Sequence, residues 1–153
     1  MGLQLEWYIE GEKQLSRVLL DLRGDTTKLF GAFNESAAKL RTQFEKEVFD
    51  SRGSSIGESW KPLSPVTLAR KARSGYGSHP LIATGAMRRS FRHAATNEFG
   101  MVFNTAEYFK YHQSNRPRKK LPRRVMMKLG NNQREMVIKV FQKHIFKSLK
   151  KSS

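Results

Sequence analysis

The spacing of apolar residues changes along the first third of the chain. Residues 3–9, LQLEWYI, alternate apolar with polar or amphipathic side chains, which is typical of a strand. Residues 15–22 place leucine and valine at intervals of three and four, and this predicts an amphipathic helix that ends near Gly24. A longer stripe of the same spacing follows a cap at Asp25 or Thr26 and predicts a second helix. The apolar members of this stripe are Phe30, Phe33, Ala37, Leu40, Phe44 and Val48.

The next segment predicts a loop and a short helix. Residues 51–59, SRGSSIGES, are rich in glycine and serine, as loops are. Ser64 and Pro65 then form a helix start, because a serine hydroxyl caps free backbone amides and proline fits the first helical position. We expect this helix to run from about Pro65 to Arg73, with another loop, SGYGSHP, after it.

The last third of the chain predicts a hairpin and a closing helix. Residues 90–104 read as two strands around a turn near residues 97–100, and residues 106–112 predict a short helix. Residues 116–124, RPRKKLPRR, contain two prolines and are therefore expected to be irregular. From Asn131 onward apolar residues recur at helical spacing, opposite a lysine-rich face, which predicts an amphipathic helix.

Together these patterns predict an α+β fold. We expect a small, mainly antiparallel sheet, a long N-terminal helical pair and a C-terminal helix. A length of 153 residues suits a single domain. We take residues 1–153 as that domain, with a basic loop at about 114–124.

The charge of the chain is unevenly distributed. Lysine and arginine number 29 against 13 acidic residues, a net charge of +16. Residues 59–153 hold 21 of the basic side chains and 3 of the acidic ones. We interpret this excess as a surface for a negatively charged partner, which is nucleic acid, an acidic protein surface or a membrane face. Solubility against self-association is the plainer alternative.

The sequence shows no pattern for catalysis, a cofactor or a metal. It contains no cysteine, which excludes disulfides, thiolate ligands and cysteine nucleophiles. Its four histidines lack metal-ligand spacing, and neither a GxSxG elbow nor a P-loop is present. Glu107 and His112 offer a base and a carboxylate, but a surface histidine at the end of an aromatic segment is the favoured interpretation. We therefore expect a protein that is not an enzyme and uses no cofactor.

Binding to nucleic acid or to a membrane remains open at this point. The basic run at 116–124 can neutralise phosphates, and Phe109 and Tyr111 can stack on bases or pack in the core. The C-terminal helix can lie on an anionic bilayer, although packing on its own domain is favoured. No apolar run approaches the ~18 residues of a membrane span, and the start lacks a secretory signal, so we expect a protein made in the cytoplasm.

Four short segments occur in an order that resembles a known family. They read W-x-P-L-S-x-x-T at 60–67, L-x-x-T-G-x-M-x-x-S at 81–90, Y-x-x-x-H-Q at 108–113 and P-x-R at 122–124. The last precedes Gly130 and the closing helix. In this order the chain is similar, over roughly residues 3–150, to the tailed-bacteriophage virion morphogenesis family, the tail-completion or head–tail joining proteins.

The resemblance implies a structural role without catalysis. Such a protein completes or caps the tail and helps join it to the head, in a ring of identical copies around the DNA passage. Its partners are then other copies, phage tail and neck or connector proteins, and potentially the genomic DNA in the channel, with no membrane. The implied location is the tail or neck of the virion, assembled in the host cytoplasm. A basic nucleic-acid-binding protein without catalysis is the alternative.

Individual side chains are assigned expected roles within this interpretation. Trp60 is an anchor whose indole N–H bonds a carbonyl, either in the core or against a neighbouring subunit. Leu63, together with Leu68, is expected to seat the short helix on the sheet. The other expected structural anchors are Gly85, in a tight turn, Tyr108 and His112. The side chains expected to face a partner or DNA are Arg88, Arg89, Arg116, Arg118, Lys119, Lys120, Arg123 and Arg124.

Overall fold

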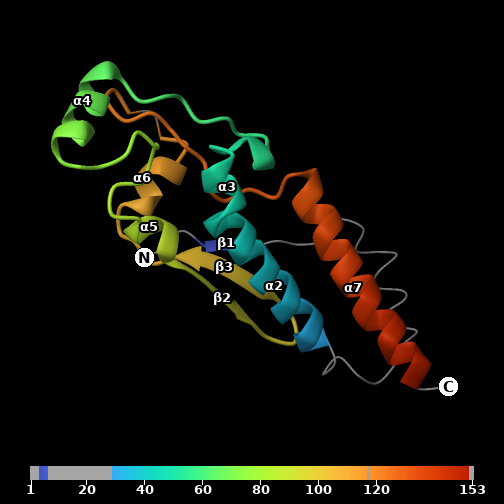
Figure 1. Ribbon diagram of the computed structural model, residues 1–153. Helices are drawn as coiled ribbons and strands as arrows, with labels where there is room; N and C mark the ends of the chain where they lie inside the picture. Colours follow the sequence, from blue (N-terminus) through green and yellow to red (C-terminus); the bar gives the residue numbers. More distant parts are fainter. Residues whose placement is uncertain (1–3, 7–28, 117, 152–153) are drawn as a thin grey trace.

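A computed structural model describes residues 4–6, 29–116 and 118–151 of the chain (Figure 1). The elements in order are β1 (Gln4–Glu6), α2 (Leu29–Glu45), α3 (Glu47–Asp50), the 3₁₀ turn η2 (Ser54–Ile56), α4 (Pro65–Arg73), α5 (Ala86–Arg89), β2 (Phe91–Ala95), β3 (Gly100–Asn104), α6 (Phe109–Gln113) and α7 (Asn131–Lys151). The helix expected over residues 15–22, and the cap expected at Asp25 or Thr26, lie outside the described residues.

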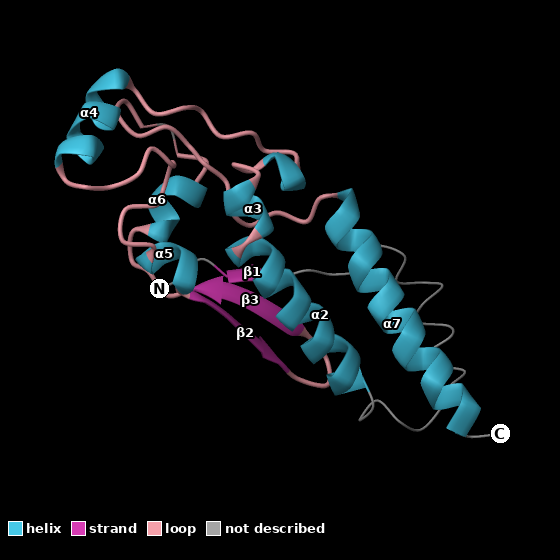
Figure 2. Cartoon of the chain, viewed as in Figure 1, coloured by secondary structure: helices cyan, strands magenta, loops and turns pink. Residues whose placement is uncertain are grey.

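Within the described residues the sheet has three strands, and both strand pairs are antiparallel. Its order is β1–β3–β2, with Leu5 opposite Val102 in one pair and His93 opposite Val102 in the other. The helix α2 lies along one face of the sheet, and α7 lies beside α2 on the side away from the strands (Figure 2). The α+β fold with a small antiparallel sheet is therefore confirmed, as are the hairpin at 90–104 and the closing helix from Asn131.

The core forms where α2 meets the sheet, the segment 125–127 and α7. Phe44, Phe49, Phe91 and Phe109 are fully buried there, and Phe91 makes edge-to-face or tilted contacts with the other three. Such ring pairs add to the apolar area that they bury. Phe30, predicted to lie on the buried stripe, is instead 46 % exposed near the N-terminal end of α2.

The long helix predicted as far as Val48 is interrupted at Lys46, where φ is −109° and ψ is −71°. Arg88 bridges the interruption. Its Nε donates to the carbonyl oxygen of Glu45 at 2.7 Å, and its Nη2 lies 3.0 Å from Asp50 Oδ1. A side chain 43 positions from Glu45 and 38 positions from Asp50 thus links α2 and α3.

The helix α4 begins as the sequence predicts but packs differently. Ser64 is its N-cap and accepts a hydrogen bond from the backbone N–H of Thr67, and Pro65 is the first helical residue. However, α4 buries none of its side chains and stands beyond the end of the sheet (Figure 1). Leu68 is 38 % exposed, so the expectation that Leu63 and Leu68 seat α4 on the sheet is wrong.

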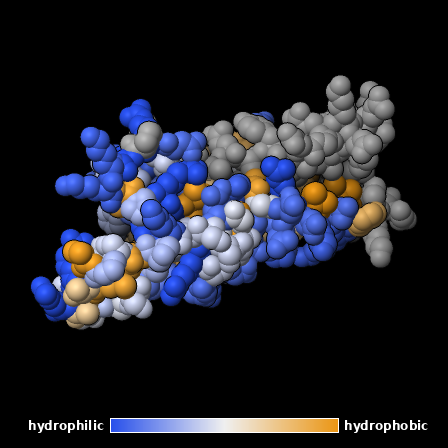
Figure 3. Space-filling view, turned by 90° about the horizontal axis from the view of Figure 1, so that it is seen from above, coloured by the Kyte–Doolittle hydropathy of each residue, from blue (hydrophilic) through white to orange (hydrophobic). Residues whose placement is uncertain are grey.

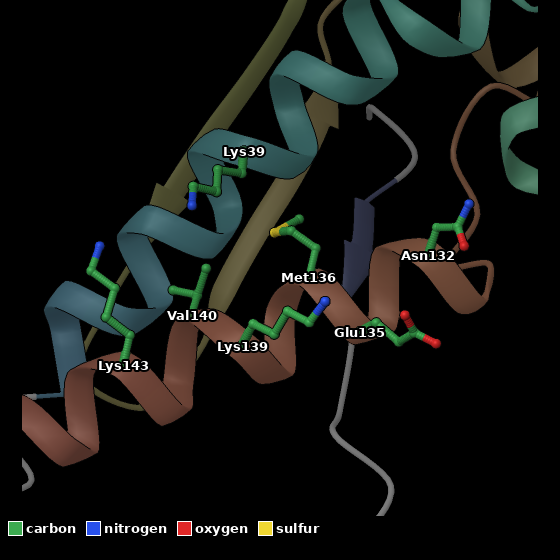
Figure 4. A pocket seen from close by; sticks show the side chains of 7 residues that line it. All are labelled: Lys39, Asn132, Glu135, Met136, Lys139, Val140 and Lys143. Carbon is green, nitrogen blue, oxygen red and sulfur yellow. The ribbon is translucent and has the colours of Figure 1, made fainter.

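The contact between α2 and α7 combines apolar packing with a charge cluster. The rings of Phe33 and Phe141 meet edge to face at 4.9 Å. A hollow of about 430 Å³ remains between the helices, with Lys39 on α2 and Lys139 and Lys143 on α7 around it (Figure 4).

Glu35 neutralises part of this positive charge. Its carboxylate contacts Lys39 at 3.1 Å, Lys143 at 3.0 Å and His144 Nε2 at 2.7 Å. The hydrogen bond from His144, followed by those from the two lysines, lowers the pKa of Glu35 from 4.5 to about 2. Because the ionised form is favoured in the folded state, this cluster stabilises the α2–α7 contact at neutral pH.

The Glu35 cluster predicts a pH-dependent loss of stability. The pKa is lower in the folded than in the unfolded chain, so the contribution is complete above about pH 4.5 and is lost as the pH falls toward 2. We expect Glu35→Gln to lower the free energy of unfolding by about 1–2 kcal/mol at pH 6. Urea denaturation at pH 6 and at pH 2.5 measures it, with Glu47→Gln, at an exposed position of α3, as the control. An equal effect of Glu35→Gln at both pH values contradicts this account.

Candidate functional site

A cleft of about 490 Å³ lies between α4 and the segment that carries α5, α6 and residues 121–124. All four sequence motifs meet in it, although they are spread over more than 60 residues. Their lining residues are Leu63 and Thr67 from the first motif, Leu81, Thr84, Gly85 and Met87 from the second, Tyr108 and His112 from the third, and Arg124 from the fourth. The cleft is therefore the place where the sequence signals converge.

Trp60 fixes the start of the segment that leads into α4. Its indole N–H donates to the carbonyl oxygen of Val125 at 2.7 Å, and its ring meets that of Phe49 edge to face at 5.3 Å. The side chain is 7 % exposed, so of the two expected positions the structure shows the core position. Gly53 has a φ of +85°, and a Cβ there would lie 2.5 Å from Trp60 Nε1. Only glycine permits this approach at a left-handed backbone position.

Arg124 holds the same segment from the other side of the cleft. Its Nε and Nη2 donate to the carbonyl oxygen of Lys61 at 3.0 and 2.9 Å, and Nη2 also reaches that of Pro62 at 3.4 Å. The side chain is only 5 % exposed. The expectation that Arg124 faces a partner from the surface is thus corrected, because its guanidinium is used to satisfy main-chain carbonyls of its own chain.

Arg88 requires the same correction. Its contacts with Glu45 and Asp50 and its position over the ring of Phe49 make it part of the fold. Arg89 is exposed, and its Nη2 donates to the carbonyl oxygen of Thr84 at 3.0 Å. That contact spans the turn at Gly85, whose φ is +77°. Gly85 therefore occupies a left-handed turn that borders the cleft.

Gln113, which was not predicted to have a role, holds the buried segment that follows Arg124. Its side-chain oxygen accepts from the backbone N–H groups of Met126 and Met127, and its Nε2 donates to the carbonyl of Met127 at 2.6 Å. The side-chain amide of Gln113 thus supplies the hydrogen bonds that a neighbouring strand would otherwise give to the buried, irregular segment at residues 126–127. The only sequence signal for it is its place in the Y-x-x-x-H-Q motif.

The charged side chains that line the cleft are all basic. Arg70, Lys71 and Arg124 surround it together with His112, and no carboxylate is among its described lining residues. Burial, followed by the charges of Arg124 and Arg118, lowers the pKa of His112 to about 4, so this imidazole is neutral at physiological pH. Burial also lowers the pKa of Lys71, whose Nζ donates to the carbonyl oxygens of His79 and Ile82.

Tyr108 and the basic loop lie on the surface around this cleft. Tyr108 is exposed at its rim, and Leu63 is half-buried in it. Arg118 lies over the ring of Tyr111, with its guanidinium carbon 4.4 Å from the centroid, whereas Phe109 is in the core. The exposed cations of the loop are Arg116, Arg118, Lys119, Lys120 and Arg123.

Among the residues that the structure describes, no group of three or more histidine and carboxylate side chains can hold a metal ion. The helices in the same part of the chain include none that is both long and apolar enough to cross a membrane. What the site offers is an apolar cleft with basic walls and a basic loop beside it.

Comparison with known proteins identifies the family. The model of the phage virion morphogenesis family matches residues 11–146, and the chain belongs to this family. No curated protein matches the chain. No solved structure matches it either.

The contacts of Arg124 predict how α4 is held. We expect Arg124→Ala to leave α2, α7 and the sheet folded and to release residues 61–80, because the carbonyls of Lys61 and Pro62 lose their donors. Trypsin cleavage within α4, at Arg70, Lys71 or Arg73, should then accelerate about tenfold, since cleavage follows local opening. Mass spectrometry of the early fragments measures it. The adjacent exposed Arg123→Ala is the control, and equal cleavage rates for the two variants count against this role.

Proposed function

We propose that the protein completes or caps the phage tail and helps join it to the head, as one subunit of a ring around the DNA passage. Its membership of a virion morphogenesis family supports a role in building the phage particle. The exposed surface of α4 supports contacts with a neighbouring subunit, as a ring requires.

The observation that carries the proposal is that the outer face of α4 is not covered by the rest of the described chain. None of its side chains is buried, and Val66 is 80 % exposed. Leu68 and Tyr76 are also exposed in this region, and Figure 3 shows hydrophobic surface gathered at the α4 end of the molecule among hydrophilic side chains. Short helices are marginal in isolation, and exposed apolar groups of this kind mark protein interfaces.

A ring requires each subunit to present two different surfaces. Neighbours in a closed ring meet head to tail, so the patch on one copy contacts another part of the next. The α4 end is separated from the opposite end of the molecule, where the β2–β3 turn lies, by the length of the sheet (Figure 1). This separation suits heterologous contacts, with α4 as one of the two faces.

Introducing a negative charge at position 66 tests whether α4 forms an interface between subunits. An acidic side chain near a helix N-terminus is favourable for the helix, so we expect Val66→Asp to leave the melting temperature of the subunit within about 2 °C. It should abolish ring formation and lower the yield of infectious particles at least tenfold. Analytical ultracentrifugation and complementation of a phage lacking the gene measure these effects. The control is Asn132→Asp, which adds the same charge at an exposed position in the first turn of α7. Normal assembly of Val66→Asp would exclude α4 as the interface.

The basic loop favours DNA binding as the second candidate function. The exposed cations at 116, 118, 119, 120 and 123 form no ion pair with a described residue of the chain, and Tyr111 under Arg118 provides an aromatic face. Unpaired cations beside an aromatic ring suit phosphate contacts with base stacking.

Salt titration distinguishes DNA binding from assembly. If the loop contacts phosphates, replacing Arg116, Arg118, Lys119 and Lys120 by glutamine should reduce the slope of log K against log salt by up to about 3.6. The fold should be unchanged, because these side chains are exposed. Fluorescence anisotropy with a labelled duplex between 50 and 200 mM salt measures the slope. An unchanged slope excludes a phosphate-binding role for the loop.

A further inference from the structure

We propose that the cleft beside α4 binds a segment of another virion protein that carries a carboxylate next to an apolar side chain. The inference rests on the proposed role in virion assembly and specifies a partner that the α4 surface alone does not. It concerns the inner wall of α4 and the residues opposite, whereas the ring interface concerns the exposed outer face around Val66.

The carboxylate is inferred from the charge of the walls. Every ionised side chain around the cleft is a cation, and the described lining contains no carboxylate to neutralise them. Arg124 is almost fully buried, and its Nε and Nη2 are occupied by carbonyls. Within the described residues its Nη1 makes no hydrogen bond. A buried guanidinium with a free N–H is a strong donor to a carboxylate, since charge-assisted hydrogen bonds are stronger than neutral ones.

His112 adds a second polar group without a partner. Its Nδ1 is buried and forms no hydrogen bond with the described chain, and the side chain lines the same cleft as Arg124. A buried polar atom without a partner is costly. A main-chain N–H or C=O group of a bound segment would relieve this cost, because a neutral imidazole nitrogen either accepts or donates.

The apolar side chain is inferred from the floor of the cleft. Met87 is buried, and Leu63, Leu81, Ile82 and Leu121 are half-buried around the same space. A volume of about 490 Å³ lies in the range of sites that enclose small ligands or anchoring side chains. Phosphate contacts require only surface charge and leave such a floor unused. A protein segment uses both the floor and the cations.

The charge of the chain argues against a second copy as the source of the segment. Each copy carries a net +16, so two basic regions repel. Of the described carboxylates, those of Glu35, Glu45, Asp50 and Glu58 are in ion pairs with described residues, whereas those of Glu47, Glu98, Glu107 and Glu135 are not. Because residues 59–153 hold 21 basic and 3 acidic side chains, a partner with an excess of carboxylates complements this cleft better than the basic region of another copy.

Photo-crosslinking in assembled particles tests the occupant directly. Ala83, an exposed residue that lines the cleft, is replaced by benzoylphenylalanine, and virions are irradiated and analysed by peptide mapping. We expect a crosslink to a different virion protein within about three residues of an aspartate or glutamate. A crosslink to another copy, to DNA or to no molecule at all overturns the inference. The same probe at position 66 reports the ring contact, so that failure of the two proposals is distinguished.

A matched pair of substitutions tests whether the space itself is needed. Ala83→Trp fills the cleft, whereas Ile138→Trp places the same side chain at an exposed position of α7, away from the cleft and from the outer face of α4. Both should fold with melting temperatures within about 3 °C of the wild type. We expect Ala83→Trp to lower the yield of infectious particles at least tenfold and Ile138→Trp to change it less than twofold. Equal yields from the two variants would falsify the inference.

Discussion

Two consecutive residues, Arg124 and Val125, hold the part of the chain on which every candidate surface depends. The carbonyl oxygen of Val125 accepts the indole N–H of Trp60, and the guanidinium of Arg124 donates to the carbonyls of Lys61 and Pro62. These contacts join segments more than 60 positions apart. The hydrogen bond of Trp60 is buried, so losing its acceptor leaves the indole N–H unsatisfied at a cost of about 1–3 kcal/mol, and those of Arg124 are partly buried. These hydrogen bonds determine where the segment after Trp60, which leads into α4, leaves the core.

The open cleft beside α4 is a consequence of these hydrogen bonds. The helix α4 is held at its base by hydrogen bonds to main-chain carbonyls, and none of its own side chains is buried. An ordinary amphipathic helix is held along its length by an apolar face, and the space below it is closed by packing. Here the space stays open, and the apolar residues that would close it remain available to another molecule. The arrangement suits a protein that acts by binding its neighbours.

The basic side chains divide into two groups with different physical roles. The guanidinium groups of Arg88 and Arg124 donate hydrogen bonds to carbonyl and carboxylate oxygens of their own chain. The cations of the loop around residues 116–123 remain exposed, where they contribute mainly to the field that the molecule presents to an approaching partner. A net charge alone does not separate these groups, because it counts a buried guanidinium and a solvated lysine equally.

The sequence by itself determined the elements whose signals are local. The stripe that forms α2 and α7, the alternation of β2 and β3, and the Ser64–Pro65 start of α4 were predictable, since each depends on neighbouring residues and on the period of one helix or strand. It also gave the four motifs of the cleft, although not the fact that they enclose one space. Only the tertiary structure decided the break at Lys46, the displacement of α4 from the sheet and the inward roles of Arg88 and Arg124. The physical reason is that an arginine is used inside or outside according to which carbonyls lie within its reach. For Arg124 those carbonyls belong to residues 62 and 63 positions away, which no local pattern contains.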